Sequence, residues 1–165
     1  MSPSTMRHLS VAAALGVACI APAAAQPMLD LVFDGDALTF TPVMDGARTG
    51  FTGFLSVDAV SIEGASGPAR LVLEIALPPG SSTGAAPHDA RILYRPDGFR
   101  DYWVSPTPFP EGAIAIERLD LAAATPRIAG RFEAPLCFTA SPMHLPDPAR
   151  CVTVSGRFDT PLVHD

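Results

Sequence analysis

The residue types best suited to contact a ligand lie in one short segment, from Arg91 to Val104. It holds the only Trp and both Tyr residues of the chain, beside several arginines. Aromatic rings next to Arg suit stacking on a sugar or a protein-binding hot spot. We therefore predict a candidate binding surface made of Tyr94, Arg95, Arg100, Tyr102 and Trp103. The alternative is that these rings cover the edge of the core, with arginine stems lying over them.

The pairing within this segment follows from its turn. Pro96-Asp97-Gly98 predicts a three-residue hairpin loop. Counting outward from that loop pairs Tyr94 with Arg100 and Arg91 with Trp103. Each Arg–aromatic pair would contribute about 0.5–1 kcal/mol at an exposed site.

One segment formally matches a catalytic motif. Gly80-Ser81-Ser82-Thr83-Gly84 fits G-x-S-x-G, with Ser82 as the nucleophile. That motif works on a strand-to-helix turn, whereas here Pro78-Pro79 precede it and Pro87 follows. We expect a surface loop from Gly80 to Pro87. A carboxylate pair for glycoside hydrolysis cannot be located among the acids of this sequence, so we predict no catalytic residues.

Metal-ligating residue types are present but scattered. Three histidines follow the first quarter of the chain, and no two of them have ligand spacing: His88, His144 and His164. A periplasmic copper or zinc site would have to gather them from separate loops, together with Met143. Three aspartates could approach calcium, yet the full calcium-loop pattern is missing, so we expect them in turns: Asp34, Asp36 and Asp45. We predict no metal and no cofactor.

The composition excludes several classes of partner and mechanism. The chain has 165 residues, a formal net charge of −6 and no Lys. Without Lys there is no Schiff-base chemistry and no phosphate-loop lysine. A nucleic-acid binder needs a basic stripe, which this acidic chain lacks. We therefore expect no nucleic-acid partner.

The first residues indicate export. Arg7 and His8 precede an apolar stretch from Leu9 to Ile20, and Ala23-Ala24-Ala25 follow. This order is typical of a secretory signal peptide cleaved at an A-x-A-like site. We expect a signal peptide at 1–25, one domain at 26–165 and a periplasmic or secreted location. The alternative is a lipoprotein anchored at Cys19. No apolar run is long enough to span a membrane.

Two cysteines remain in the expected mature chain, and an oxidising compartment favours a disulfide between Cys137 and Cys151. It would close a loop of about 15 residues, worth roughly 3 kcal/mol. A near-repeat supports it: Gly130-Arg131-Phe132 is matched by Gly156-Arg157-Phe158. Strand parity sets both cysteines on the same face of two similar strands. The same parity predicts diagonal ion pairs, Glu133–Arg157 and Arg131–Asp159.

The remaining pattern is one of short strands separated by Pro and Gly. We expect an all-β fold, an antiparallel β-sandwich of about eight or nine strands, with a small closed β-barrel as the alternative. The expected strands are 28–33, 38–40, 52–62, 71–77, 90–95, 99–105, 113–121, 128–138 and 151–162. An Asp34-Gly35-Asp36 turn joins the first two.

The last third of the chain resembles a known group of domains. Its segments are Gly112–Asp120, Ile128–Phe132 and Val152–Asp159. They resemble the closing strands of bacterial secreted or lipid-anchored β-sandwich domains of unknown function. The resemblance implies an exported β-sandwich, and it carries no catalytic residues over to this chain.

Together these features predict an exported non-catalytic β-domain that binds an envelope component, a protein or a small ligand. Two alternatives stay open: a periplasmic metal-binding protein and a small hydrolase.

Overall fold

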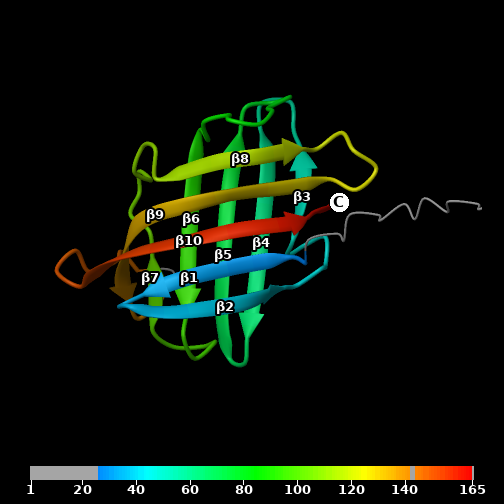
Figure 1. Ribbon diagram of the computed structural model, residues 1–165. Helices are drawn as coiled ribbons and strands as arrows, with labels where there is room; N and C mark the ends of the chain where they lie inside the picture. The colour runs from blue at the N-terminus through cyan, green and yellow to red at the C-terminus, as the bar shows by residue number, and fades with distance from the viewer. Residues whose placement is uncertain (1–25, 142–143, 165) are drawn as a thin grey trace, which may run out of the picture.

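A computed structural model describes residues 26–141 and 144–164. The predicted signal peptide with Cys19, and Met143, lie outside the described residues. The fold is all-β, as predicted, and of the two expected architectures it is the closed barrel: eight antiparallel strands close on themselves and three more are added (Figure 1). The strands are β1 (Met28–Phe33), β2 (Asp36–Pro42), β3 (Gly50–Gly53), β4 (Asp58–Ser66), β5 (Ala69–Leu77), β6 (Asp89–Arg95), β7 (Tyr102–Val104), β8 (Ile114–Asp120), β9 (Arg127–Thr139), β10 (Cys151–Pro161) and β11 (Val163–His164).

The barrel is flattened into two crossing layers. Strands β8, β9, β10, β1 and β2 run side by side in front, and β3 to β6 run across them behind (Figure 1). Two strands turn the corners. On one side β9 pairs first with β8 and at its end with β7, while β10 lies along its other side from Arg127 to Cys137. On one side β4 pairs first with β3 and then with β2, while β5 lies along its other side. A strand that changes partner in this way joins the two layers into one closed sheet.

Alternation along each strand fills the interior. In β5, Leu71, Leu73, Ile75 and Leu77 are all buried, while Val72, Glu74 and Ala76 face outward. The inward residues of the front layer meet them, among them Leu29, Leu31, Phe132, Leu136 and Phe158. A period of two along paired strands produces this separation of apolar interior from polar exterior. The barrel is therefore a packed core, and its polar side chains are displayed on the outside.

The predicted turn between β1 and β2 forms at Asp34-Gly35, but Asp36, expected in the turn, already belongs to β2. Asp34 and Gly35 have φ values of 50° and 86°, and Phe33 pairs with Asp36. Two successive residues in the left-handed region make a two-residue type I′ turn, for which Asp-Gly is a favoured sequence.

The predicted long strand over 52–62 is wrong, because the structure contains a hairpin there. β3 ends at Gly53 and β4 begins at Asp58, and these two residues pair. The amide of Phe54 donates to the carbonyl of Val57 at 2.8 Å, which closes the turn. Because the residues at this turn are apolar, the hydrophobic pattern predicted one continuous strand instead of a turn. With the short β11 added, the described part of the chain contains eleven strands, more than expected.

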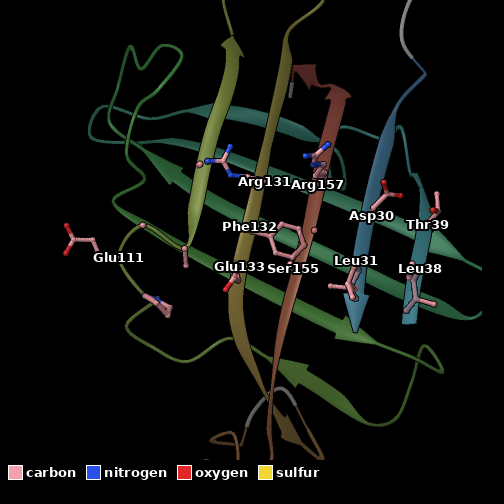
Figure 2. Close-up of a pocket in the computed structure, with 17 residues that line it drawn as sticks. Asp30, Leu31, Leu38, Thr39, Glu111, Arg131, Phe132, Glu133, Ser155 and Arg157 are labelled. Carbon is pink, nitrogen blue, oxygen red and sulfur yellow. The ribbon is translucent and has the colours of Figure 1, made fainter. Parts of the chain in front are cut away.

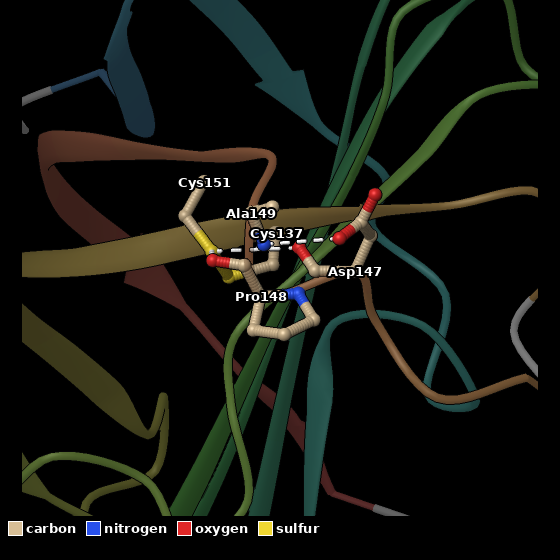
Figure 3. The surroundings of a disulfide bond; sticks show 5 residues. All are labelled: Cys137, Asp147, Pro148, Ala149 and Cys151. Atoms are coloured by element: carbon tan, nitrogen blue, oxygen red, sulfur yellow. Dashed lines mark hydrogen bonds between the residues drawn. A yellow bond between two sulfur atoms is a disulfide. The ribbon is translucent and has the colours of Figure 1, made fainter.

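The pairing of the last two long strands confirms the disulfide. β9 and β10 are antiparallel neighbours in which Cys137 lies opposite Cys151 and Arg131 opposite Arg157. The segment between the cysteines folds back on this bond, and the Cys151 sulfur lies 3.4 Å from the Pro148 carbonyl oxygen (Figure 3). The guanidinium carbon of Arg150 lies 3.7 Å from the centre of the Phe138 ring.

The predicted ion pairs on these strands are wrong. Arg131 pairs with Glu117 on β8, and Arg127 pairs with Asp159 at 2.7 Å. Arg131 finds a different partner because β8 lies beside β9 and brings Glu117 within reach. Glu133 and Arg157 form no ion pair within 4.0 Å among the described residues. Over the described residues, no helix is long and apolar enough to cross a membrane.

Candidate functional site

The hairpin that was predicted to form a binding surface has a different register. β6 ends at Arg95 and β7 begins only at Tyr102, so the loop spans six residues, 96–101. The Asp97 carboxylate accepts hydrogen bonds from the amides of Phe99, at 3.2 Å, and Arg100, at 2.7 Å. This side chain–backbone turn holds residues that were expected to continue the strand. Consequently Tyr94 pairs with Trp103, and the predicted pairs Tyr94–Arg100 and Arg91–Trp103 are wrong.

The new register turns two of the three rings toward the core. Tyr94 is 5% exposed, and its ring centre lies 5.0 Å from that of Phe33. Trp103 is half-buried and lies 5.0 Å from Phe33 and 5.7 Å from Phe138. Burial raises the pKa of the Tyr94 hydroxyl, and the nearby Asp36 carboxylate adds to this effect. Tyr94 and Trp103 therefore behave as the alternative interpretation expected: they cover the edge of the core and do not form a binding surface.

The other three predicted surface residues differ in exposure. Tyr102 and Arg95 are half-buried, and Arg100 is exposed in the loop. The five residues therefore do not form one outward-facing surface.

The three predicted histidines stay apart. His88 precedes β6 and donates its amide to the Ala76 carbonyl, whereas His164 packs its ring against Phe51 at 4.7 Å. His144 lies in the loop closed by the disulfide. In the part of the chain that the structure describes, no three His, Cys, Asp or Glu side chains are grouped so that they could hold a metal ion.

The G-x-S-x-G segment is a surface loop, as predicted. Ser82 and Thr83 are exposed, and the Thr83 hydroxyl accepts a hydrogen bond from the Leu119 amide at 3.1 Å. The Gly84 amide donates to the Ile116 carbonyl at 3.0 Å. The loop is thereby docked along β8, with no strand-to-helix turn to activate Ser82.

The feature that sequence analysis missed is a groove on the outer face of the front layer, which we call the outer groove (Figure 2). It has a volume of about 840 Å³. Its floor is built from the outward residues of β2, β1, β10, β9 and β8. The polar residues that line it are Asp30, Thr39, Glu111, Arg131, Glu133, Ser155 and Arg157.

Strand register arranges these side chains in two rows across the sheet. The first row runs Thr39, Asp30, Arg157, Arg131 and Ala115, on five successive strands. The second row, two residues along, runs Ala37, Val32, Ser155 and Glu133. A small residue stands at one end of each row, Ala115 in the first and Ala37 in the second, and the charged groups lie in a depression beside them.

One wall of the outer groove is the loop before β8. The Ala113 amide donates to the Pro110 carbonyl at 3.2 Å, and Gly112 has a φ of 74°. The Glu133 amide then donates to the Ala113 carbonyl at 2.8 Å, which fixes the loop to β9. Glu111 thus stands at the rim, away from the floor (Figure 2).

The electrostatics of the floor centre on two arginines. Arg131 and Arg157 lie directly opposite each other on β9 and β10 (Figure 2). Like charges in this position repel and destabilise a strand pair. Glu117 offsets the charge of Arg131. Among the described residues, Arg157 makes no ion pair within 4.0 Å, although Asp30 lies opposite it on β1.

These groups suit binding more than catalysis. The lining residues, all in the described ranges, include no His, Cys or Lys. Ser155 lies opposite Glu133 but has no histidine beside it to act as a base. Asp30 and Glu133 project from one sheet face with β10 between them, and so they do not face each other across a cleft.

A signal for the outer groove was present in the sequence. The repeated Gly-Arg-Phe segments place Arg131 and Arg157 on one face, opposite to Phe132 and Phe158. What parity alone does not reveal is that small residues on two other strands, Ala37 on β2 and Ala115 on β8, leave space around the two arginines.

No protein-family model, curated protein or solved structure matches the chain. The resemblance to bacterial secreted β-sandwich domains therefore stays a prediction.

Proposed function

We propose that this chain is an exported, non-catalytic binding module that holds a polar ligand in the outer groove. The observation that carries the proposal is the groove itself, about 840 Å³ lined by both signs of charge and by two hydroxyl groups. Because the barrel interior is filled by apolar side chains, this external depression is a better ligand site than the core. Rigid strands hold its polar groups in place, which lowers the entropy cost of binding.

The location is part of the same proposal. The Cys137–Cys151 disulfide suits an oxidising compartment, and residues 1–25 have the pattern of a signal peptide. A protein outside the cytoplasm meets polymers and small solutes of the envelope, which are mostly polar.

The test is to titrate the isotope-labelled protein with a panel of sugars, uronic acids, amino acids and inorganic phosphate while recording amide NMR spectra. We expect one class of compound to shift the amides of Asp30, Glu133 and Ser155. Ser155→Tyr should fill the groove and abolish these shifts. Thr153→Tyr is the matched control, since Thr153 is exposed on the same face of β10 but does not line the groove. Shifts confined to other regions, or none from any compound, would contradict the proposal.

A further inference from the structure

The opposed arginines indicate what kind of ligand the outer groove takes. We infer that it binds an acidic sugar, with one carboxylate on Arg131 and Arg157 and the sugar hydroxyls on the flanking acids. This inference rests on the proposed function and adds to it the chemical class of the ligand.

The centre of the proposed site is formed by the guanidinium groups of two arginines. Arg131 and Arg157 are opposed on neighbouring strands, where Cβ atoms lie about 5 Å apart. At that separation one carboxylate can accept hydrogen bonds from both groups, provided that Arg131 turns from Glu117, its partner in the structure. Such charge-assisted bonds are about twice as strong as neutral ones. An anion would also remove the repulsion between the two cations.

A second opposed pair of arginines lies in the other layer and serves as a comparison. Arg70 and Arg95 are partners on β5 and β6. Arg70 is occupied within the fold: it pairs with Glu63 at 3.9 Å and donates to the carbonyls of Gly67 and Ala69. In the groove Arg131 is likewise occupied, by Glu117. The two pairs differ in their other member, because Arg95 is half-buried, whereas Arg157 is exposed and faces the open groove without an ion pair among the described residues.

The flanking acids limit the ligand to a single negative charge at this point. Asp30 lies opposite Arg157 on the other side, Glu133 is two residues from Arg131 on β9, and Glu111 is at the rim. A polyphosphate or a run of acidic residues would be repelled by these three carboxylates. They suit hydrogen-bond donors instead, and Thr39 and Ser155 add hydroxyl groups at the same level.

Sugar hydroxyls meet this requirement better than the other common donor, an ammonium group. In an α-amino acid the ammonium and the carboxylate share one carbon atom, so a carboxylate held by two guanidinium groups would bring the ammonium close to them. The hydroxyls of a uronic acid are neutral and spread around the ring, which places them toward Asp30 and Glu133.

A neutral sugar fits less well, because the groove offers no aromatic ring for stacking. Among the described residues, Phe132 is the only aromatic one that lines it, and it is 3% exposed. Recognition therefore has to come from charge and hydrogen bonds. Removing the carboxylate charge should therefore remove most of the affinity.

The experiment is a calorimetric and NMR titration of the full mature chain with glucuronate, the methyl ester of glucuronic acid, glucose and glutamate. We expect glucuronate to bind with one site and the ester and glucose at least about tenfold more weakly, since one charged hydrogen-bond group is lost. Arg157→Gln should weaken glucuronate binding by a similar factor. Arg91→Gln, an exposed arginine on the outer face of β6 in the other layer, should leave it unchanged.

Each other result overturns the inference in a recognisable way. If glucose and the ester bind in the groove as well as glucuronate does, a polar-ligand site exists but its selection of an anion is wrong. If glutamate is preferred, the ligand class is wrong and the groove remains. If no compound shifts a groove amide, the proposed function fails as well. Unchanged melting temperatures for both Gln variants show that the fold is intact.

Discussion

Tyr94 and Trp103 are directly opposed on β6 and β7, and the rings of both lie 5.0 Å from the ring of Phe33 on β1. The cluster thus joins the back layer, which contains β6, to the front layer, which contains β1. Phe40 on β2 extends it, with 6.1 Å between its ring centre and that of Tyr94. Edge-to-face and tilted contacts of this kind add to the stability gained from burial.

The first prediction is that this cluster stabilises the barrel. Trp103→Ala should lower the free energy of unfolding by about 3 kcal/mol, the lower end of the range for large aromatic residues, because Trp103 is half-buried. Arg100→Ala, in the exposed loop, should change it by less than about 0.5 kcal/mol. Urea unfolding followed by far-UV circular dichroism measures both. If the two variants unfold at the same urea concentration, the cluster contributes nothing.

The second prediction concerns stability at high pH. The pKa of Tyr94 is raised in the folded protein, so the unfolded chain releases the tyrosine proton first, near its ordinary pKa of about 10. The stabilisation is complete below that pH and is lost as the pH rises through the folded pKa. Tyr94→Phe cannot ionise and should lose less stability between pH 9 and pH 11. Urea unfolding across this interval provides the measurement, and equal pH dependence of the two proteins would contradict the assignment.

The third prediction concerns the disulfide. Replacing both Cys137 and Cys151 with Ser removes the closure of a loop of about 15 residues and should cost roughly 3 kcal/mol. A reducing agent should lower the free energy of unfolding of the wild type by the same amount and leave that of the double variant unchanged. A wild type that is insensitive to reduction would show that the bond is unimportant for stability.

The fourth prediction concerns a close approach of strands. A Cβ atom at Gly156 would lie 2.2 Å from the Asp30 carbonyl oxygen and 2.3 Å from a ring carbon of Phe132. The backbone oxygen cannot move without breaking the β1–β10 pairing, so Gly156→Ala should destabilise the fold by about 3 kcal/mol or more.

Gly53→Ala is the matched control, because a Cβ there would meet only an Asp58 carboxylate oxygen at an ordinary 3.5 Å. Thermal unfolding of the two variants compares them. Similar melting temperatures would mean that the strands separate more easily than the structure indicates.

Sequence patterns predicted the parts of the fold that depend on local periodicity. Alternation identified β5, and Asp34-Gly35 identified the first turn. The shared parity of Cys137 and Cys151 was sufficient to pair β9 with β10. In each case the relevant interactions lie within one strand or between two strands with matching patterns.

Patterns were insufficient where a single side chain changes the backbone path. The Asp97 carboxylate lengthens the hairpin loop. Because the strand pairing thereby shifts by an odd number of residues, the Trp103 side chain lies on the opposite face from the one predicted. The choice of a closed barrel over a sandwich depends on β9 and β4 changing partners along their length, and no local signal marks that change. The outer groove combines residues of five strands and depends on all of these pairings.

The position of β10 has a consequence for how the molecule is made. β10 is the last of the long strands in the sequence, yet it lies between β1 and β9, and Met28 pairs with Asp159. During synthesis β1 and β2 emerge first, whereas β10, the second neighbour of β1, is made only after most of the chain. Pairings so distant in sequence slow folding and leave an edge open to wrong partners in the meantime. A nascent chain stopped before Cys151 would therefore carry Asp30 and Arg131 without the strand that brings them together.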